Sequence, residues 1–212
     1  AATPPSAFIS AIIVDRDGRR IIDETRYGAA VGRAIIRDHD AKAWILADAA
    51  LMAEARKQLI TQTLWFQRLQ GAALMLFGSS RGSSLTEVAQ RAGIDPDGLI
   101  ATVNSHNDAI DTHTEDPAGK PEQFVRRIGR EPFTLLNISI QPNLINPTPM
   151  LTLGGIRVDE ATGAVIAASG APIPGLFSAG RTAIGICSDS YVSGLSIADC
   201  VFSGRRAGQC VV

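Results

Sequence analysis

Tyr191 and Ser193 are the residues of this sequence whose types and spacing could do chemistry. They stand just before Leu195 to Arg206, where apolar residues recur at the spacing of one helix face. The first turn of a helix has N–H groups without an internal partner and carries the positive end of the helix dipole, so it can hold an anion or an electron-rich ring edge. A phenol at such an end places a proton donor beside an anion-stabilising site.

The elements that must position this pair are a strand, a loop and the helix. An apolar run from Gly175 to Gly180, set off upstream by Pro172 and Pro174, predicts a short buried strand. The helix start is built from small residues such as Gly194 and Ser196, which keep side-chain bulk away from the first turn. An ordinary strand, loop and helix whose glycines only make turns explains this spacing equally well.

The segment PIPGLFSAGR, followed by SYVSGLSIADCVFSGRRAG, closely resembles the C-terminal flavin-contacting segment of the fumarate reductase and 3-ketosteroid dehydrogenase flavoprotein superfamily. In that superfamily the helix points its N-terminus at the N1/C2=O edge of FAD. The resemblance therefore implies FAD as the cofactor, held mainly by backbone N–H groups at the strand end and the helix start. The residues that it assigns to the flavin are Ala179, Gly180, Arg181, Gly194, Leu195, Ser196 and Ile197.

Three further segments resemble the same superfamily. DGRRIIDE resembles the element that enters its catalytic domain, although Asp23 stands where Asn is usual. SLTEVAQRAGIDPDGLIATVNSHNDAID resembles a helix pair of its capping domain, with His106 in place of an aromatic residue, and TLGGIRVDEATG resembles the hairpin that returns to the FAD domain. The resemblance implies an α+β chain with a partial capping (catalytic) domain, residues 1–148, and the C-terminal hairpin, strand and helix segment of the FAD-binding domain, residues 149–212.

The sequence has no G-x-G-x-x-G motif, which a complete FAD-binding domain of this type needs for the ADP half of the cofactor. The resemblance therefore implies the C-terminal portion of a longer flavoprotein, whose missing partner is the N-terminal FAD-binding half. Alone, this portion is expected to be inactive and to expose a surface that packs on the missing sheet. If the gene encodes only these 212 residues, a degenerate, non-catalytic flavoprotein domain is the alternative.

The reacting positions narrow the chemistry that the resemblance implies. Fumarate reductases of this superfamily carry a His before T-x-G-G and an Arg in the tail, because a dicarboxylate needs cationic groups and an acid. This chain has Leu151 and Tyr191 there. Its Tyr191-Val192-Ser193 resembles the 3-ketosteroid dehydrogenases, most closely those that introduce the 4,5 double bond into 5α-reduced 3-ketosteroids. Arg26 could match the family's remaining catalytic Arg, which keeps fumarate reductase-type chemistry on another enoate as an alternative.

Desaturation next to a ketone needs a polarised carbonyl, a base for the α-proton and a hydride acceptor. Uncharged phenols suit an apolar pocket, where a carboxylate would be costly to desolvate. We therefore expect Tyr191 to be the acid/base or carbonyl-polarising group, with Ser193 tuning a neighbouring phenol. Family members place a second catalytic Tyr in the capping domain, for which Tyr27 is the candidate; an ordinary, partly buried tyrosine explains Tyr27 equally well.

Composition excludes several other classes. Twenty basic and 21 acidic residues leave no field that would attract nucleic acid or a charged membrane, and there is no run of 18 apolar residues. Cys187, Cys200 and Cys210 lack metal or disulfide spacing, which favours a reducing, cytoplasmic location. His106 and His113 are seven positions apart and have no acidic partner at ligand spacing, so packed or solvated histidines are favoured over a metal site.

The other patterns predict the remaining elements. Helices are predicted at 29–38, 49–59, 84–91 and 95–110, the last two from a Ser84 capping box and from Asp95 before Pro96. Residues 8–14 and 19–23 predict one hairpin, 150–159 and 164–167 another, and 43–48 a strand or a helix start. Residues 64–77 are apolar enough for core or for lining an apolar ligand, and core is favoured. Loops are predicted at 78–83 and, on the surface, at 111–123.

Overall fold

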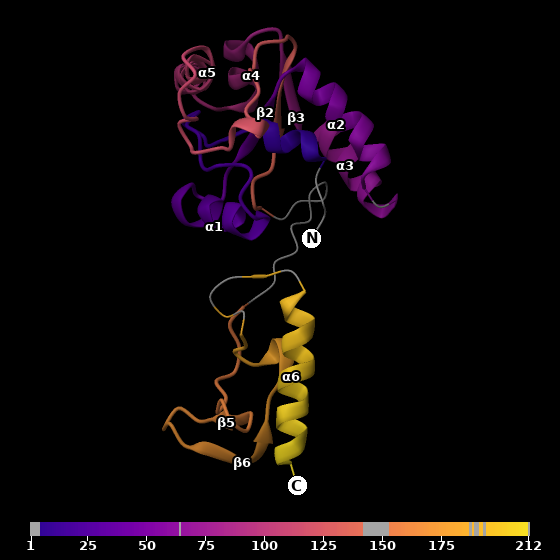
Figure 1. Ribbon diagram of the computed structural model, residues 1–212, viewed down its shortest axis with the longest axis vertical. Helices are drawn as coiled ribbons and strands as arrows, with labels where there is room; N and C mark the ends of the chain where they lie inside the picture. Colours follow the sequence, from indigo (N-terminus) through magenta and orange to yellow (C-terminus); the bar gives the residue numbers. More distant parts are fainter. Residues whose placement is uncertain are drawn as a thin grey trace. The chain divides into compact units, whose positions relative to one another are not determined.

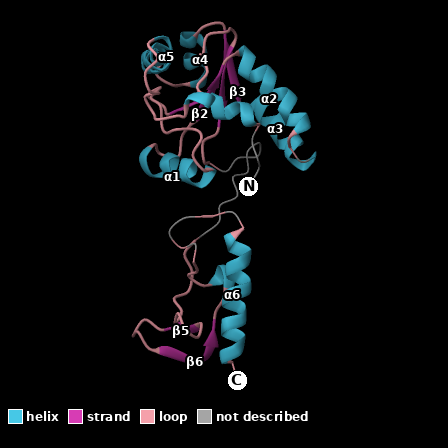
Figure 2. Ribbon diagram, in the orientation of Figure 1, coloured by secondary structure: helices cyan, strands magenta, loops and turns pink. Residues whose placement is uncertain are grey.

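The computed structural model describes residues 5–63, 65–141, 153–186, 188, 191–192 and 194–211. The chain divides into two compact units, Ala1–Thr148 and Pro149–Val212, which are coloured along the sequence in Figure 1. The predicted α+β class is confirmed, because antiparallel sheets and separate helices make up both units (Figure 2). We describe each unit by itself.

The first unit is built on a four-stranded antiparallel sheet with the order β1-β2-β4-β3. Its strands are β1 (Ile12–Val14), β2 (Trp44–Ala47), β3 (Ser79–Gly82) and β4 (Phe133–Asn137). Leu46 pairs with Leu135 across the two central strands, and both side chains are fully buried. For residues 43–48 the sequence allowed either a strand or a helix start, and the structure forms the strand β2 there. Asp48 then caps the next helix, since its carboxylate accepts from Ala50 N and Leu51 N at 3.0 Å.

Helices and 3-10 turns cover this sheet (Figure 2). They are η1 (Ser6–Ser10), α1 (Gly28–Asp38), α2 (Ala49–Thr61), α3 (Trp65–Phe77), α4 (Leu85–Ala92), α5 (Pro96–Asp111) and η2 (Glu122–Phe124). Leu135 joins a core cluster with Val88 of α4 and Leu99 of α5, whereas Leu136 joins another with Met52 of α2. Because successive strand residues point to opposite faces, the two clusters lie on the two sides of the sheet.

The predicted helix starts at Ser84 and Asp95 are confirmed. Ser84 Oγ accepts from Glu87 N at 3.1 Å, while the Glu87 carboxylate reaches back to Ser83 N at 2.7 Å, one residue earlier than in a standard capping box. Asp95 accepts from Gly98 N at 3.1 Å. Helix α4 ends where predicted, at Gly93, which takes a left-handed conformation with φ +71°.

Two strand predictions of the first unit are wrong, the first of them in part. The first arm of the hairpin predicted from residue 8 begins instead with the turn η1, and only Ile12–Val14 form a strand. The hairpin itself is present in short form: Val14 and Arg20 form an antiparallel bridge, and Ile21 N donates to Ile13 O at 2.9 Å. The loop predicted at 78–83 contains β3, which pairs with β4 from Ser79 to Gly82. Serine and glycine give no strand signal, so only the pairing with β4 makes this segment a strand.

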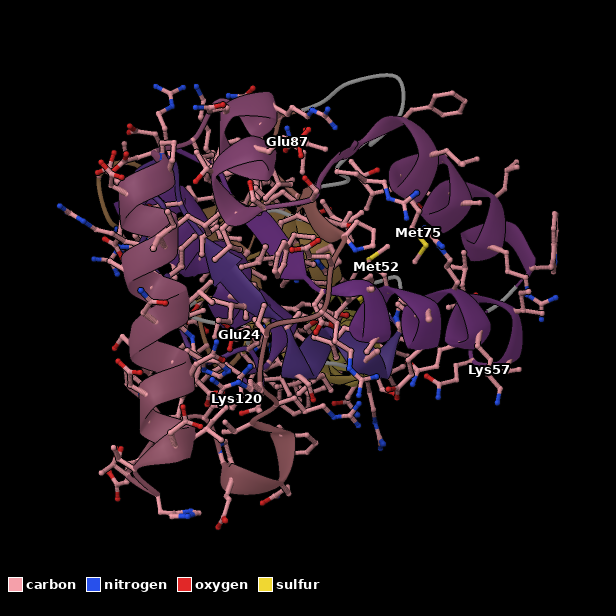
Figure 3. All side chains as sticks on the ribbon, turned by 90° about the horizontal axis from the view of Figure 1, so that it is seen from above. Glu24, Met52, Lys57, Met75, Glu87 and Lys120 are labelled. Carbon is pink, nitrogen blue, oxygen red and sulfur yellow. The ribbon has the colours of Figure 1, made fainter. Side chains whose placement is uncertain are left out.

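Helix α3 departs from the expected core. Trp65, Leu69 and Leu76 are 80%, 78% and 72% exposed, so the core interpretation of residues 64–77 is wrong for these side chains. Only the other side of the helix packs inward: Met75 contacts the cluster that contains Met52 of α2, and Figure 3 shows these two methionines between the helices. Trp44, in contrast, is a buried member of the core.

The second unit contains β5 (Ala164–Ile166) paired with β6 (Pro172–Phe177), the turn η3 (Gly180–Thr182) and α6 (Leu195–Cys210). The predicted C-terminal helix is confirmed and runs four residues past Arg206. The predicted strand is present as β6, but it is exposed rather than buried, since β5 is its one strand partner in the described part of the unit. Of the arm predicted at 150–159, residues 150–152 lie outside the described residues, and the rest contributes isolated bridges at Ile156 and Val158.

Candidate functional site

The N-terminus of α6 has no side-chain cap. Gly194 occupies the N-cap position with φ +84°, a conformation that favours glycine, and it has no side chain that could accept from the first turn. Val192 O accepts from Leu195 N at 3.2 Å. Gly194 O accepts from Ile197 N at 3.2 Å, so Leu195 N and Ile197 N both have backbone acceptors. Among the described residues, no side-chain cap competes for the other N–H groups of this turn. This arrangement suits an external acceptor such as an electron-rich ring edge.

Two buried hydroxyl groups flank the residues that we expected at the flavin. Ser178 Oγ and Ser196 Oγ are both buried, and neither has a hydrogen-bond partner among the described residues. Ser178 follows β6 and precedes Ala179, and Ser196 lies in the first turn of α6. A buried hydroxyl without a partner is costly, so both groups are suited to a polar ligand. The donor set of backbone N–H groups and hydroxyls fits the polar edge of FAD.

The predicted strand-end residues are held against the middle of α6. Gly180 N donates to Ser203 Oγ at 2.8 Å, and Ser203 Oγ in turn donates to Asp199 O at 2.5 Å. Gly180 has φ +61°, and a Cβ added there would lie 3.1 Å from Cys200 Sγ. The glycine is needed for both conformation and close approach. The structure therefore brings Ala179–Arg181 onto the Cys200–Ser203 side of α6, beyond the first turn that holds Gly194–Ile197.

The proposed catalytic residues belong to different parts of the chain. Tyr191 is half-buried and precedes α6 in the second unit. Ser193 lies outside the described residues. Tyr27 is 49% exposed and occupies the N-cap position of α1 in the first unit, next to the exposed Arg26. Each unit is described by itself, so the roles given to Tyr191, Ser193 and Tyr27 stay predictions.

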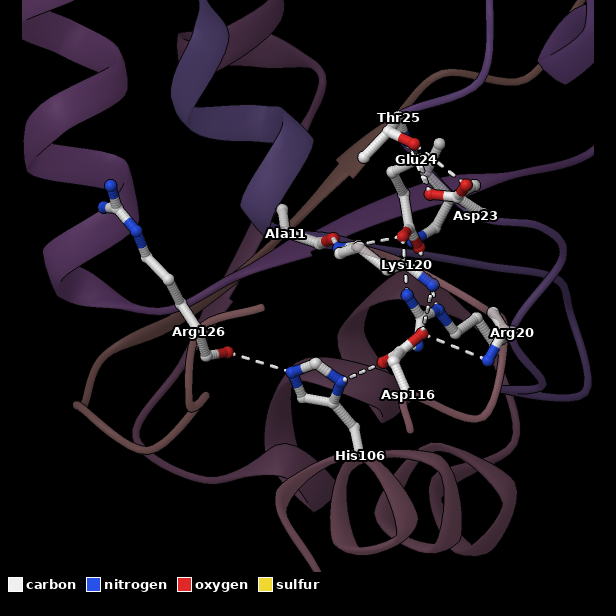
Figure 4. Close-up of polar contacts among 11 residues, drawn as sticks. Ala11, Arg20, Asp23, Glu24, Thr25, His106, Asp116, Lys120 and Arg126 are labelled. Carbon is white, nitrogen blue, oxygen red and sulfur yellow. Dashed lines mark hydrogen bonds and ion pairs between the residues drawn. The ribbon is translucent and has the colours of Figure 1, made fainter. Parts of the chain in front are cut away.

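A cluster of buried charges includes Arg20 and Glu24, which come just before the segment that contains Tyr27 in the sequence; Figure 4 shows the cluster. Arg20 lies between two carboxylates: its Nη2 is 2.7 Å from Glu24 Oε2, and its Nη1 is 2.6 Å from Asp116 Oδ2. Lys120 Nζ is 2.8 Å from Glu24 Oε2 and donates to Ala11 O at 2.7 Å. Glu24 also accepts from Ile13 N at 2.8 Å, which ties the cluster to β1. The side chains of Glu24, Asp116 and Lys120 have no exposed surface.

The ionisation of this cluster follows from burial opposed by opposite charges. Burial alone would raise the pKa of Asp116, but hydrogen bonds from Arg20 and from Lys120 N, with the charge of Arg20, lower that pKa from 3.8 to about 2. Burial would lower the pKa of Arg20, yet Glu24 and Asp116 raise it overall. For Lys120 burial is the larger effect, so its pKa is lowered despite the neighbouring Glu24. The two cations and two carboxylates therefore neutralise one another.

His106 completes the cluster from α5. Its Nδ1 lies 3.0 Å from Asp116 Oδ2 and its Nε2 lies 2.9 Å from Arg126 O (Figure 4). The side chain is almost completely buried, so the expectation of a packed histidine is confirmed for His106. No group of three or more His, Cys, Asp or Glu that could hold a metal occurs among the residues with described positions.

Sequence reasoning missed this cluster. The loop predicted on the surface at 111–123 contains Asp116 and Lys120, and both are buried, so the prediction is wrong for these residues. Arg20 and Asp116 are 96 positions apart, and no local pattern links them. One local signal was present: Arg20 and Glu24 stand four positions apart with opposite charges. Asp116 and Lys120 belong to the lining of a hollow of about 730 Å³, but their side chains have no exposed surface. The main effect of the cluster is to fix the backbone that enters Thr25, Arg26 and Tyr27.

No helix in the described ranges combines the length and the apolar character that a membrane crossing requires. The described cysteines, Cys200 and Cys210, are free thiols, and Cys187 lies outside the described residues. Arg127 forms an exposed ion pair with Asp111, as does Arg126 with Glu54.

Comparisons with known proteins show which proteins the chain resembles. A family model described as FAD binding domain matches residues 7–194. The chain is 31% identical over 179 residues to the 3-oxo-5-alpha-steroid 4-dehydrogenase of Comamonas testosteroni, covering 84% of this chain and 34% of that protein. It is 25% identical over 201 residues to the probable fumarate reductase Ifc3 of Shewanella frigidimarina, covering 95% of this chain and 31% of that protein.

A solved structure gives the same relation in three dimensions. The 3-ketosteroid-delta4-(5alpha)-dehydrogenase of Rhodococcus jostii RHA1, in complex with 4-androstene-3,17-dione, superposes with a TM-score of 0.72 at 25% identity, over 98% of this chain and 39% of that chain. The chain thus spans about a third of the length of the relatives it matches. With a family match over most of its length and a donor set that fits the flavin, the chain belongs to the FAD-binding flavoprotein family that includes 3-ketosteroid dehydrogenases and fumarate reductases.

Proposed function

We propose that this chain is part of an FAD-dependent oxidoreductase that dehydrogenates a 3-ketosteroid-like substrate, introducing a double bond next to a ketone. The observation that carries the proposal is the place of Tyr191, three positions before the N-cap residue Gly194 of α6. By the resemblance described above, fumarate reductases of the superfamily have an arginine at this position. The similarity to the 3-oxo-5-alpha-steroid 4-dehydrogenase and to the structure with bound 4-androstene-3,17-dione supports it.

In this mechanism the chain supplies proton transfer and orientation. Bound FAD supplies the acceptor for the hydride that leaves the β-carbon. The Tyr191 phenol donates a hydrogen bond to the ketone oxygen; in the alternative role it first loses its proton to solvent, and the phenolate Oη then takes the α-proton. Ser193 tunes a neighbouring phenol. We expect the remaining N–H groups of Gly194–Ile197 and of Ala179–Arg181 to orient the flavin edge, because Leu195 N, Ile197 N and Gly180 N already donate to Val192 O, Gly194 O and Ser203 Oγ. Tyr27 is the candidate for the second phenol.

Uncharged groups favour an apolar ketone over a dicarboxylate. A tyrosine keeps its proton near neutral pH and donates without the several kcal/mol that a charged group would cost on desolvation. Arg26 is the residue that favours the second candidate, fumarate reductase-type reduction of another enoate, because it is an exposed cation next to Tyr27 and the chain is similar to a probable fumarate reductase. In either case the proposed enzyme is cytoplasmic, in keeping with the free thiols of Cys200 and Cys210.

Dye reduction by the FAD-loaded protein tests the assignment, with a saturated 3-ketosteroid compared against succinate. We expect reduction with the steroid alone, and a loss of kcat of about a hundredfold or more in Tyr191→Phe at unchanged FAD content. Arg26→Gln is the matched variant and should leave the steroid rate within a few-fold. Succinate turnover that depends on Arg26 would replace the proposal by the second candidate. No turnover of either substrate by a flavin-loaded protein would favour a non-catalytic domain.

A further inference from the structure

The exposed side of α3 is an apolar feature of the first unit that the proposed function does not explain. Trp65, Leu69 and Leu76 fall within about 40° of one another on a wheel with about 100° per residue, so they form one stripe along the helix. Met75 and Gly71 mark the inward side: Met75 packs on the core cluster, and a Cβ on Gly71 would lie 2.5 Å from Leu59 Cδ1 of α2. The stripe therefore points away from the unit's core, and it is highly exposed.

Basic residues surround this stripe. The segment 49–82, which contains α2 and α3, has four basic residues against one acidic residue: Arg56, Lys57, Arg68 and Arg81 against Glu54. All four basic side chains are exposed, and Figure 3 shows Lys57 extending outward from α2. Glu54 is already paired with Arg126 at 2.6 Å. The near-neutral charge of the whole chain conceals this local excess.

A hollow beside the stripe adds a second, independent feature. It has a volume of about 470 Å³ and is lined by Leu76 together with Arg56, Arg81, Arg91, Ser79 and Ser80. Arg91 is paired with Glu87, whereas no acidic residue lines the hollow itself. Arg91 also donates to Arg81 O, and Ser79 Oγ donates to Met75 O at 2.7 Å. The guanidinium groups of Arg56 and Arg81 and the Ser80 hydroxyl, next to a leucine, fit a phosphate-bearing headgroup whose acyl chains lie along the apolar stripe.

We propose that the exposed stripe of α3 and the arginine-lined hollow beside it dock on an anionic membrane surface. Aromatic and aliphatic side chains on one helix face with Lys and Arg at its edge are the pattern of a helix that lies in the interface plane. A second copy of the chain fits poorly, because a self-complementary contact would bring the same arginines against one another. The proposal does not depend on the reaction, although a membrane is a natural reservoir of apolar ketones.

Vesicle sedimentation of the FAD-loaded protein tests the proposal. The probes are vesicles of phosphatidylcholine alone and of equal parts phosphatidylcholine and phosphatidylserine. We expect binding to the mixed vesicles, weakened by salt, and much weaker binding to the neutral ones. Arg56→Gln with Arg81→Gln should weaken binding about twenty-five-fold, because each charge near the surface contributes about fivefold. Leu69→Gln with Leu76→Gln should weaken it about tenfold or more.

Matched variants on other elements separate docking from general effects. Arg37→Gln with Arg205→Gln removes the same charge from α1 and α6, and Ile36→Gln with Val201→Gln changes exposed apolar residues there; both should bind as the parent protein does. Equal binding to both kinds of vesicle, or equal loss in the matched variants, would overturn the proposal. If the vesicles do not bind, two other findings would also overturn the proposal. One is a dimer that the α3 changes dissociate, and the other is coverage of α3 by the rest of the polypeptide. Far-ultraviolet circular dichroism checks that each variant is folded.

Discussion

Replacing Lys120 by methionine tests the buried charge cluster most directly. Methionine keeps the length and apolar stem of the side chain but removes the ammonium, which contacts Glu24 Oε2 at 2.8 Å and Ala11 O at 2.7 Å. The variant leaves one carboxylate in excess within a cluster that water does not reach. Removing one partner of a buried ion pair costs about 3–5 kcal/mol, so we expect a decrease of that size in the free energy of unfolding.

The companion variant Glu24→Gln removes the opposite charge, and the two changes should not be additive. Alone, it leaves Lys120 and Arg20 with only Asp116 to balance them, and we expect a similar loss of about 3–5 kcal/mol. In the double variant one cation and one carboxylate remain, Arg20 and Asp116, which are 2.6 Å apart. The double variant should therefore be more stable than the sum of the single effects predicts, by about 1–3 kcal/mol.

Urea denaturation followed by tryptophan fluorescence is the assay. Trp44 lies in β2 and is buried, so a Trp65→Phe background leaves one reporter in the sheet. Asp111→Asn is the matched control, because Asp111 and Arg127 form an ion pair in which both side chains are 54% exposed; it should change the free energy of unfolding by less than about 1 kcal/mol. A loss below about 1 kcal/mol for Lys120→Met, or strict additivity in the double variant, would refute the reasoning.

Three further outcomes follow from the first unit. The pKa of Asp116 is lowered from 3.8 to about 2, so its stabilisation is complete above about pH 5 and is lost as the pH falls through 2, about 2–3 kcal/mol in all. Urea midpoints measured against pH should show this fall, and Asp116→Asn should remove it. Gly98→Ala should destabilise by more than about 3 kcal/mol, since its Cβ would lie 1.9 Å from Asp17 O. Gly32→Ala in α1 should stabilise by up to about 1 kcal/mol, because the nearest atom to its Cβ, Ile140 Cδ1, is 3.9 Å away. Equal thermal midpoints would contradict the contrast. Ser84→Ala should cost about 1 kcal/mol through loss of the α4 cap, measured by the same urea assay, and a neutral result would show that Glu87 alone holds that turn.

The parts of the fold that the sequence predicts are those determined by neighbouring residues. Ser84 and Asp95 accept from N–H groups three positions ahead, and Gly93 ends its helix through its own backbone conformation. Such signals lie within one turn, so the helix starts could be found from the sequence alone. Strand β3 could not, because residues 79–82 are extended only through their pairing with β4, more than 50 positions later.

The same distinction between local and long-range determinants applies to the candidate site. The uncapped start of α6 follows from Gly194, and the close approach of the preceding turn follows from Gly180, so local sequence was enough to select both segments. The charge cluster joins residues 20–24 to residues 106–120, and each half alone resembles an ordinary charged surface. A prediction from charge patterns assigns solvent to such residues, because burial of a charge depends on the partner that the fold brings.

The two units contribute to the proposed chemistry in different ways. In the first unit, the segment that reaches Tyr27 is anchored at Glu24, which Ile13, Arg20 and Lys120 hold from three directions. In the second unit, the groups suited to the flavin are mostly backbone N–H groups, whose positions depend on glycine conformations rather than on side-chain identity. Substitutions that disturb the cluster should therefore alter the placement of Tyr27 and leave the affinity for FAD unchanged, whereas bulk at Gly194 should lower FAD content first. Unchanged FAD content in a Gly194→Val variant of the flavin-loaded protein would remove α6 from the flavin site.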